Sequence, residues 1–197
     1  MTRLTSQIIE EARRFPEGTP LAAKALLHLG SRAAVDQALS RLTRRGRLLR
    51  AGRGLYVLPV ESRFGARAPS VEKVVEAVAA QRGETIAPNG AAAANALGLT
   101  TQVPVRAVYL TSGPSRTLRL GRQTVELKHA PPWQLVLPNR PAGQAVRALA
   151  WLGPSMARAS LQQLRKRLSP TELTALAAVG PRLPTWLAEP VSQATHG

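Results

Sequence analysis

The feature that most constrains the fold of this chain is an amphipathic helical pattern at residues 32–45, which runs directly into a short hairpin pattern. Its apolar residues share one helix face: Val35, Ala38, Leu39 and Leu42. Gly46 is a stop signal, and two strand-like runs follow at residues 47–50 and 55–58. The glycines of the connecting segment, residues 51–54, allow the positive φ angles that a tight turn needs.

Two further helices are predicted ahead of this pattern, at residues 5–14 and 19–29. Thr19 and Pro20 open the second of them as N-cap and first-turn proline, and Ser31 caps the helix that follows. A short helix, a tight turn, a longer amphipathic helix and a hairpin form the order of a winged helix-turn-helix. We therefore expect this fold over residues 1–62.

The remaining sequence predicts a mixed α/β domain over residues 68–197, with a helical C-terminal region and a linker at residues 63–69. Helices are expected at residues 71–81, 90–97, 142–152, 155–168 and 170–179. Strands are expected at residues 84–87, 105–110, 116–120, 124–128 and 134–137. Three late prolines predict an irregular tail. The fold class expected for the whole chain is α+β.

The charge balance is strongly basic, with 27 lysines and arginines against 11 acidic residues and a formal net charge of +16. Residues 32–53 alone hold seven arginines and one acid, Asp36. Such a balance is typical of a protein that meets a polyanion, although a solvated basic surface is the alternative. The concentration in one helix and its hairpin favours double-stranded DNA, which carries one charge per ~1.7 Å of its axis.

The candidate DNA-binding residues lie on the polar face of this helix and on the hairpin. They are Ser31, Arg32, Ala33, Gln37, Ser40, Arg41, Arg44, Arg45, Arg47, Arg50 and Arg53. Residues near the start of such a helix reach base edges, so Gln37 is a candidate for adenine and Arg32 for guanine. Arginines near its end are expected on phosphates, and Arg53 at the hairpin tip on phosphate or in the minor groove. A winged helix that contacts protein instead is the alternative.

Catalytic and metal chemistry have little support in the sequence, and we expect no enzyme, no metal site and no cofactor. The absence of cysteine excludes thiolate chemistry, and the histidines do not have the spacing of metal ligands. No nucleophile elbow or phosphate-binding loop is present. Glu72 and Glu76 fit a solvated helix face better than a catalytic pair. The polar run at residues 111–116 has the composition to bind an anion but fits a hairpin turn better.

No apolar run in the sequence resembles a signal peptide or reaches the ~20 residues of a membrane span. We therefore expect a soluble cytoplasmic protein without a membrane partner.

Several segments together resemble the AbiEi-type antitoxin family. They are residues 31–42, Gly46, residues 50–56, the Asn-Ala-Leu-Gly-Leu segment within residues 88–104, and residues 109–113 and 125–130. The resemblance covers roughly residues 5–155. It implies an antitoxin of a type IV toxin–antitoxin or abortive-infection system. The N-terminal domain would repress its own promoter at repeated half-sites, and the C-terminal domain would counter a nucleotidyltransferase-like toxin without a stable complex.

Two rival functions stay open at this point. One is a stand-alone winged-helix regulator whose C-terminal domain senses a ligand or dimerises. The other is an enzyme or RNA-binding protein with an accessory winged helix. A downstream nucleotidyltransferase gene would favour the antitoxin, and an isolated gene would favour the stand-alone regulator. The sequence leaves the oligomeric state, the operator and the toxin open.

Overall fold

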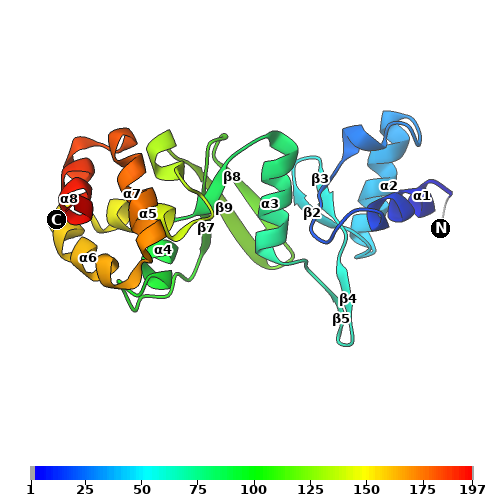
Figure 1. Ribbon diagram of the computed structural model, residues 1–197. Helices are drawn as coiled ribbons and strands as arrows, with labels where there is room; N and C mark the ends of the chain where they lie inside the picture. Colours follow the sequence, from blue (N-terminus) through cyan, green and yellow to red (C-terminus); the bar gives the residue numbers. More distant parts are fainter. Residues whose placement is uncertain (1–2, 197) are drawn as a thin grey trace. The chain divides into compact units, whose positions relative to one another are not determined.

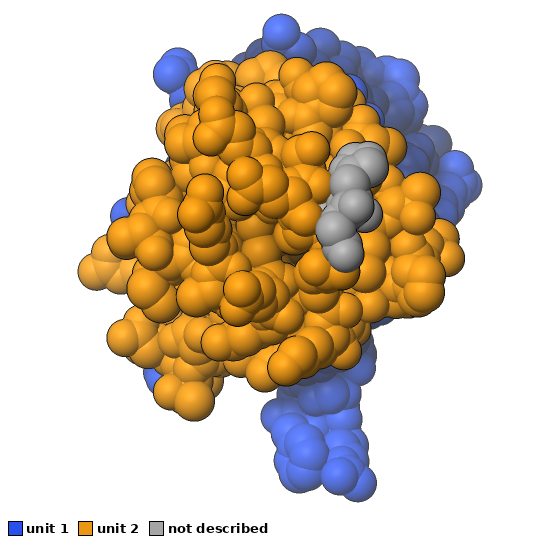
Figure 2. All heavy atoms as spheres, turned by 60° about the vertical axis from the view of Figure 1, so that its left-hand side comes forward, with its two compact units in different colours: residues 1–84, 116–126 blue, residues 85–115, 127–197 orange. Residues whose placement is uncertain are grey.

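The computed structural model describes residues 3–196 of the chain, and Figure 1 shows its helices and strands. The α+β class that the sequence predicts is confirmed, since helices and small sheets both occur along the chain. The residues group into two compact units, residues 1–84 with 116–126 and residues 85–115 with 127–197, which Figure 2 colours separately. The N-terminal unit is therefore discontinuous in sequence.

The N-terminal unit begins with a helix, a strand, a helical turn, a longer helix and a hairpin. In chain order its elements are α1 (Arg3–Arg13), β1 (Leu21–Ala22), the 3₁₀ turn η1 (Ala23–Leu26), α2 (Arg32–Arg44), β2 (Leu49–Gly52), β3 (Leu55–Val57), β4 (Val60–Ser62), β5 (Gly65–Arg67), α3 (Val71–Arg82) and β8 (Arg116–Leu120). β1, β3 and β2 form a three-stranded sheet in that order, with both pairs antiparallel. The helix expected at residues 32–45 and the hairpin that follows it are present, whereas β1 and η1 stand in place of the helix expected at residues 19–29.

Helix α2 has the start, stop and buried face that its sequence predicts. Ser31 Oγ accepts a hydrogen bond from the Ala34 backbone N–H at 3.3 Å, and Gly46 ends the helix at φ +68°. The buried face consists of Val35, Ala38, Leu39 and Leu42. This face packs into a core with apolar residues of α1 and η1, so the opposite face of α2 is left to solvent.

The helix predicted at residues 19–29 is wrong. Leu21 pairs with Tyr56 of β3, and the Ala23 N–H donates to the Gly54 carbonyl at 3.3 Å. Because these backbone groups are committed to the hairpin, only the 3₁₀ turn η1 forms between β1 and α2. Tertiary pairing has overridden local helix propensity here.

The linker predicted at residues 63–69 is also wrong, because residues 60–67 form the β4–β5 hairpin. Val60 pairs with Arg67 and Ser62 with Gly65, and Gly65 takes φ +100° in the turn. The segment was missed because it lacks the apolar alternation of a half-buried strand.

The N-terminal unit extends past residue 62, where the sequence analysis placed the end of the first domain. Lys73 Nζ of α3 lies 2.5 Å from Glu17 Oε2, and Gln81 Nε2 donates to the Pro20 carbonyl at 2.8 Å. Leu118 of β8 is almost fully buried and packs beside Gly52 of the hairpin. Both α3 and β8 therefore help to complete this unit.

The second unit consists of short strands followed by a helical region. Its elements are β6 (Ile86–Pro88), α4 (Gly90–Ala96), β7 (Ala107–Thr111), the end of β9 (Gln123–His129), the 3₁₀ turn η2 (Pro132–Leu135), α5 (Pro141–Leu152), α6 (Pro154–Arg167), α7 (Pro170–Val179), the 3₁₀ turn η3 (Gly180–Arg182) and α8 (Thr185–His196). Within this unit β6 and β7 pair antiparallel, with Ile86 opposite Thr111 and Pro88 opposite Tyr109. Helix α4 lies close against α5, since a Cβ at Gly90 would overlap Trp151 and the Arg147 carbonyl.

Two predictions for the second half of the chain are wrong. The strand expected at residues 134–137 is replaced by η2, which follows two prolines. The tail expected to be irregular contains α8, with Pro190 inside it. Leu187 and Val191 are both fully buried in the helical core, and this burial offsets the backbone hydrogen bond that the proline removes.

Candidate nucleic-acid interface

The exposed face of α2 carries the predicted contact residues of this helix. Arg32, Ala33, Gln37, Ser40, Arg41 and Arg44 are all exposed, as is the capping residue Ser31. No large apolar side chain lies among them. The face is therefore polar and basic, directly opposite the buried stripe of the same helix.

Arg32 and Asp36 form an ion pair on this face that the sequence analysis did not foresee. Arg32 Nε lies 2.8 Å from Asp36 Oδ2, and about half of each side chain is exposed. The spacing i, i+4 allows this pair on any helix. A DNA contact by Arg32 would therefore use the guanidinium N–H groups that do not bond to Asp36, or would require the ion pair with Asp36 to break.

The remaining predicted residues continue the basic surface past the end of α2. Arg45, Arg47, Arg50 and Arg53 are all exposed. Arg53 occupies the two-residue turn between β2 and β3, where Gly54 supplies φ +69°. All eleven predicted residues are thus exposed. The β2–β3 hairpin follows α2 directly, since α2 ends at Arg44 and β2 begins at Leu49.

A cleft of about 230 Å³ lies where α2 ends, and it contains a residue that the sequence analysis missed. Arg13, from the last turn of α1, lines it together with Arg45 and Arg47. Glu61 and Ala66 of the β4–β5 hairpin line it as well. The position of Arg13 follows from the packing of α1 on α2, which gives no signal in the sequence around Arg13.

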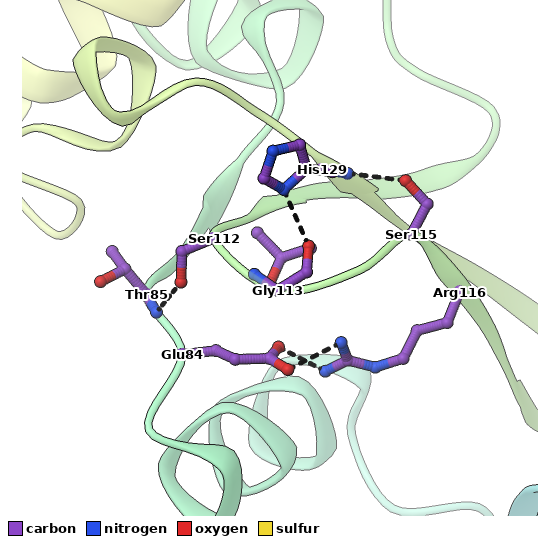
Figure 3. Close-up of polar contacts among 8 residues, drawn as sticks. Glu84, Thr85, Ser112, Gly113, Ser115, Arg116 and His129 are labelled. Carbon is purple, nitrogen blue, oxygen red and sulfur yellow. Dashed lines mark hydrogen bonds and ion pairs between the residues drawn. The ribbon is translucent and has the colours of Figure 1, made fainter.

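In the polar run at residues 111–116, the serine hydroxyls accept hydrogen bonds from nearby backbone groups (Figure 3). In the second unit, Ser112 Oγ accepts from the Thr85 N–H at 2.9 Å, and Ser115 Oγ accepts from the His129 N–H at 2.9 Å. His129 Nδ1 lies 3.0 Å from the Gly113 carbonyl, which can only accept, so Nδ1 carries the proton. The hydroxyls thus satisfy backbone groups of the turn, which supports the hairpin-turn interpretation.

Three acidic residues of the N-terminal unit are either paired or exposed. In the N-terminal unit, Arg116 donates to both carboxylate oxygens of Glu84, at 3.0 and 2.6 Å (Figure 3). Glu72 and Glu76 of α3 are both exposed. Among the described side chains, no three histidine, aspartate or glutamate residues come together as a metal site.

Arg147 of α5 is a buried cation that anchors the second unit. Its guanidinium donates to the carbonyls of Gln134, Val136 and Pro138 at 3.4, 3.5 and 2.9 Å. Burial lowers the pKa of Arg147 to about 10, so the side chain still carries its charge at neutral pH. Arg147 is 1% exposed, which leaves no face for a ligand. Its role is to fix the segment before α5.

The fold and surface define an α+β protein with a basic helix-and-hairpin face in its N-terminal unit. The chain belongs to a family of unknown function, DUF6088, whose model matches residues 7–177. No curated protein matches the sequence. Within residues 3–196, no helix is both long enough and apolar enough to cross a membrane.

Among solved structures, the chain is similar to the crystal structure of the RV2827C protein from Mycobacterium tuberculosis. The two share 16% identity at a TM-score of 0.49, and the match covers 100% of this chain and 77% of the other.

Proposed function

We propose that this protein binds double-stranded DNA through α2 and the β2–β3 turn and represses its own promoter. The observation that carries the proposal is the two-sided character of α2. One face is buried in the core, and the other presents three arginines, one aspartate and one glutamine without a large apolar side chain. A protein-binding helix would expose apolar anchors at its centre.

The position of each residue along α2 suggests whether it contacts bases or phosphates. Ser31, Arg32, Ala33 and Gln37 lie in the first turns, from which side chains reach base edges in the major groove. The arginines at the end of α2 and in β2 are placed for phosphates, which carry no base information. Arg53 in the turn is the candidate for backbone or minor-groove contact.

The proposal extends to an antitoxin that works in the cytoplasm. It rests here on the resemblance of residues 88–104, 109–113 and 125–130 to AbiEi-type antitoxins. In this proposal the second unit counters a nucleotidyltransferase-like toxin without forming a stable complex. Repression and antitoxin action would then belong to different units of one chain.

DNA binding is tested by fluorescence anisotropy on the duplex upstream of the protein's own gene and on a scrambled duplex. The double variant Arg41→Ala/Arg44→Ala removes two charges from α2. It should flatten the plot of log K against log salt by about 1.8 units, the share of two phosphates. The matched control Arg158→Ala/Arg182→Ala removes two exposed arginines from the second unit and should leave the slope unchanged. An equal slope for both double variants would refute the assignment to α2.

Antitoxin action is tested by co-expression with the neighbouring toxin gene. The full chain should rescue growth, and it should still do so when Arg41 and Arg44 are replaced by alanine. Loss of rescue in that double variant, with the protein folded, would contradict the separation of the two activities.

A further inference from the structure

The β4–β5 hairpin, residues 60–67, is an arm without a core of its own. Every residue from Glu61 to Arg67 is exposed. Figure 1 shows the hairpin extending away from the helices and strands around it. An isolated two-stranded hairpin has little stability in water, and this exposed arm adds no buried apolar side chain between Glu61 and Arg67 to the core of its unit.

The tip of this arm presents an aromatic ring to solvent. Phe64 is 87% exposed, and the Arg63 guanidinium carbon lies 4.8 Å from the centre of its ring. The turn beneath the ring is held by Ser62, whose Oγ donates to the Gly65 carbonyl at 2.6 Å and accepts from the Phe64 N–H at 3.3 Å. The Phe64 ring therefore lies on a hydrogen-bonded turn with the Arg63 guanidinium beside it.

The base of the arm adjoins the candidate nucleic-acid interface. Glu61 and Ala66 line the same cleft as Arg45 and Arg47, which follow the end of α2. Arg67, at the end of β5, adds a further exposed cation. The foot of the arm thus borders the arginine-lined cleft at the end of α2, where Glu61 adds one carboxylate.

We infer that the arm is a second DNA-contacting element, in which Phe64 inserts as an apolar wedge between base steps and Arg63 contacts a neighbouring phosphate. This inference rests on the proposed DNA binding and adds to it a bend in the DNA. Apolar wedges of this kind partly unstack a base step from the minor groove and kink the duplex. A base step offers an aromatic surface between two phosphates, which complements an aromatic ring with the Arg63 guanidinium beside it.

The composition of the arm argues for DNA over a protein pocket as the occupant. Phe64 is the single large apolar side chain among residues 61–67, whereas protein-binding patches cluster several. The arginines at its tip and foot would be poorly matched to an apolar pocket. A second copy of this chain is itself basic at +16, which disfavours a copy-to-copy contact through this arm.

The test compares Phe64→Ala with Phe64→Leu and with Phe15→Ala, which truncates another exposed phenylalanine of the same unit. The probe is a duplex of about 30 base pairs from the upstream region, labelled at both ends so that energy transfer reports bending. Phe64→Ala should weaken binding about tenfold and reduce the bend, since stacking of a base on an aromatic ring supports such a change. Phe64→Leu should keep most of the bend, and Phe15→Ala should behave like the native protein. Thermal unfolding of all three should match the native chain.

The outcomes separate the arm from the proposed function. If Phe64→Ala binds and bends DNA like the native protein while Arg41→Ala/Arg44→Ala loses binding, the arm inference is overturned and the proposed function stands. If the native protein does not bind the duplex at all, the proposed function fails first. If Phe64→Ala changes the oligomeric state in light scattering without changing DNA affinity, the arm is a contact between copies and the inference is overturned.

Discussion

The Arg32–Asp36 ion pair leads to a prediction about how tightly α2 holds DNA. In Asp36→Asn, the carboxylate that lies 2.8 Å from Arg32 is replaced by a neutral group of the same shape. An exposed i, i+4 pair contributes about 0.3–0.5 kcal/mol to stability. The loss should therefore lower the melting temperature by no more than about 2 °C, and the fold should stay intact.

The effect on DNA binding should be larger. The neutral amide of the Asp36→Asn variant does not repel phosphates. On a scrambled duplex, which offers Arg32 no operator base to contact, Arg32 is free to approach a phosphate instead. A unit charge interaction at about 4 Å in water amounts to about 1 kcal/mol, or about fivefold in affinity. One further phosphate contact steepens the salt dependence by about 0.9. Between 50 and 200 mM salt, that steepening multiplies the loss of affinity by roughly 3.5.

The assay is an anisotropy titration on a scrambled duplex across this salt range. Glu11→Gln is the matched control, because it removes one acid from a similar short-range pair: Glu11 Oε2 of α1 lies 3.1 Å from Nη1 of Arg14, just past the end of that helix. The control should change neither affinity nor slope. Equal gains in both variants would mean that only net charge matters. Weaker binding in Asp36→Asn would mean that Asp36 holds Arg32 in its binding position, and either result refutes the reasoning.

Three further predictions address readout, folding and pH. Arg53→Ala should weaken binding to operator and scrambled DNA alike and flatten the salt slope by about 0.9. Gln37→Ala should leave the slope unchanged and cost roughly 1–3 kcal/mol on the operator alone, and titrations showing the reverse pattern would contradict the placement of α2. Leu39→Ala, at a fully buried position, should lower the free energy of unfolding in urea by about 2–5 kcal/mol, whereas a change near zero would contradict the core described for α2. Hydrogen bonds from the Ala142 N–H and from the Arg140 guanidinium hold the pKa of Glu172 below its ordinary value of 4.5. The stability added by this carboxylate is complete above that value and is lost as pH falls through the lowered pKa, so the melting temperatures of the native chain and of Glu172→Gln should differ at neutral pH and converge as the pH falls below about 4.5.

Helices were predictable where local signals agree with one another. For α2 and α3, a capping serine, a periodic apolar stripe and a stop glycine all occur in sequence, and both helices begin and end within one residue of the prediction. The exposure of the candidate residues followed from the same periodicity. Because Val35, Ala38, Leu39 and Leu42 point into the core, the residues on the opposite face of α2 are exposed to solvent.

Elements set by distant partners were not predictable. Residues 19–29 have helical composition, but the pairing of Leu21 with Tyr56 depends on a strand that comes much later in the chain. Arg13 joins the cleft at the end of α2 through the packing of α1, and the β4–β5 arm has no buried face whose periodicity could reveal it. Helix α8 overrides the local signal of Pro190 because Leu187 and Val191 reach the core.

The split sequence of the N-terminal unit has a consequence for how the protein is made. When the ribosome has released residues 1–84, this unit still lacks residues 116–126. The missing segment includes Leu118 and Leu120, each only 1% exposed in the finished fold. At about 5–20 residues per second, a few seconds pass before that segment emerges. A message or chain cut short before residue 116 therefore yields an N-terminal unit with an unfinished core, so a complete N-terminal unit is produced only together with residues 85–115 of the second unit.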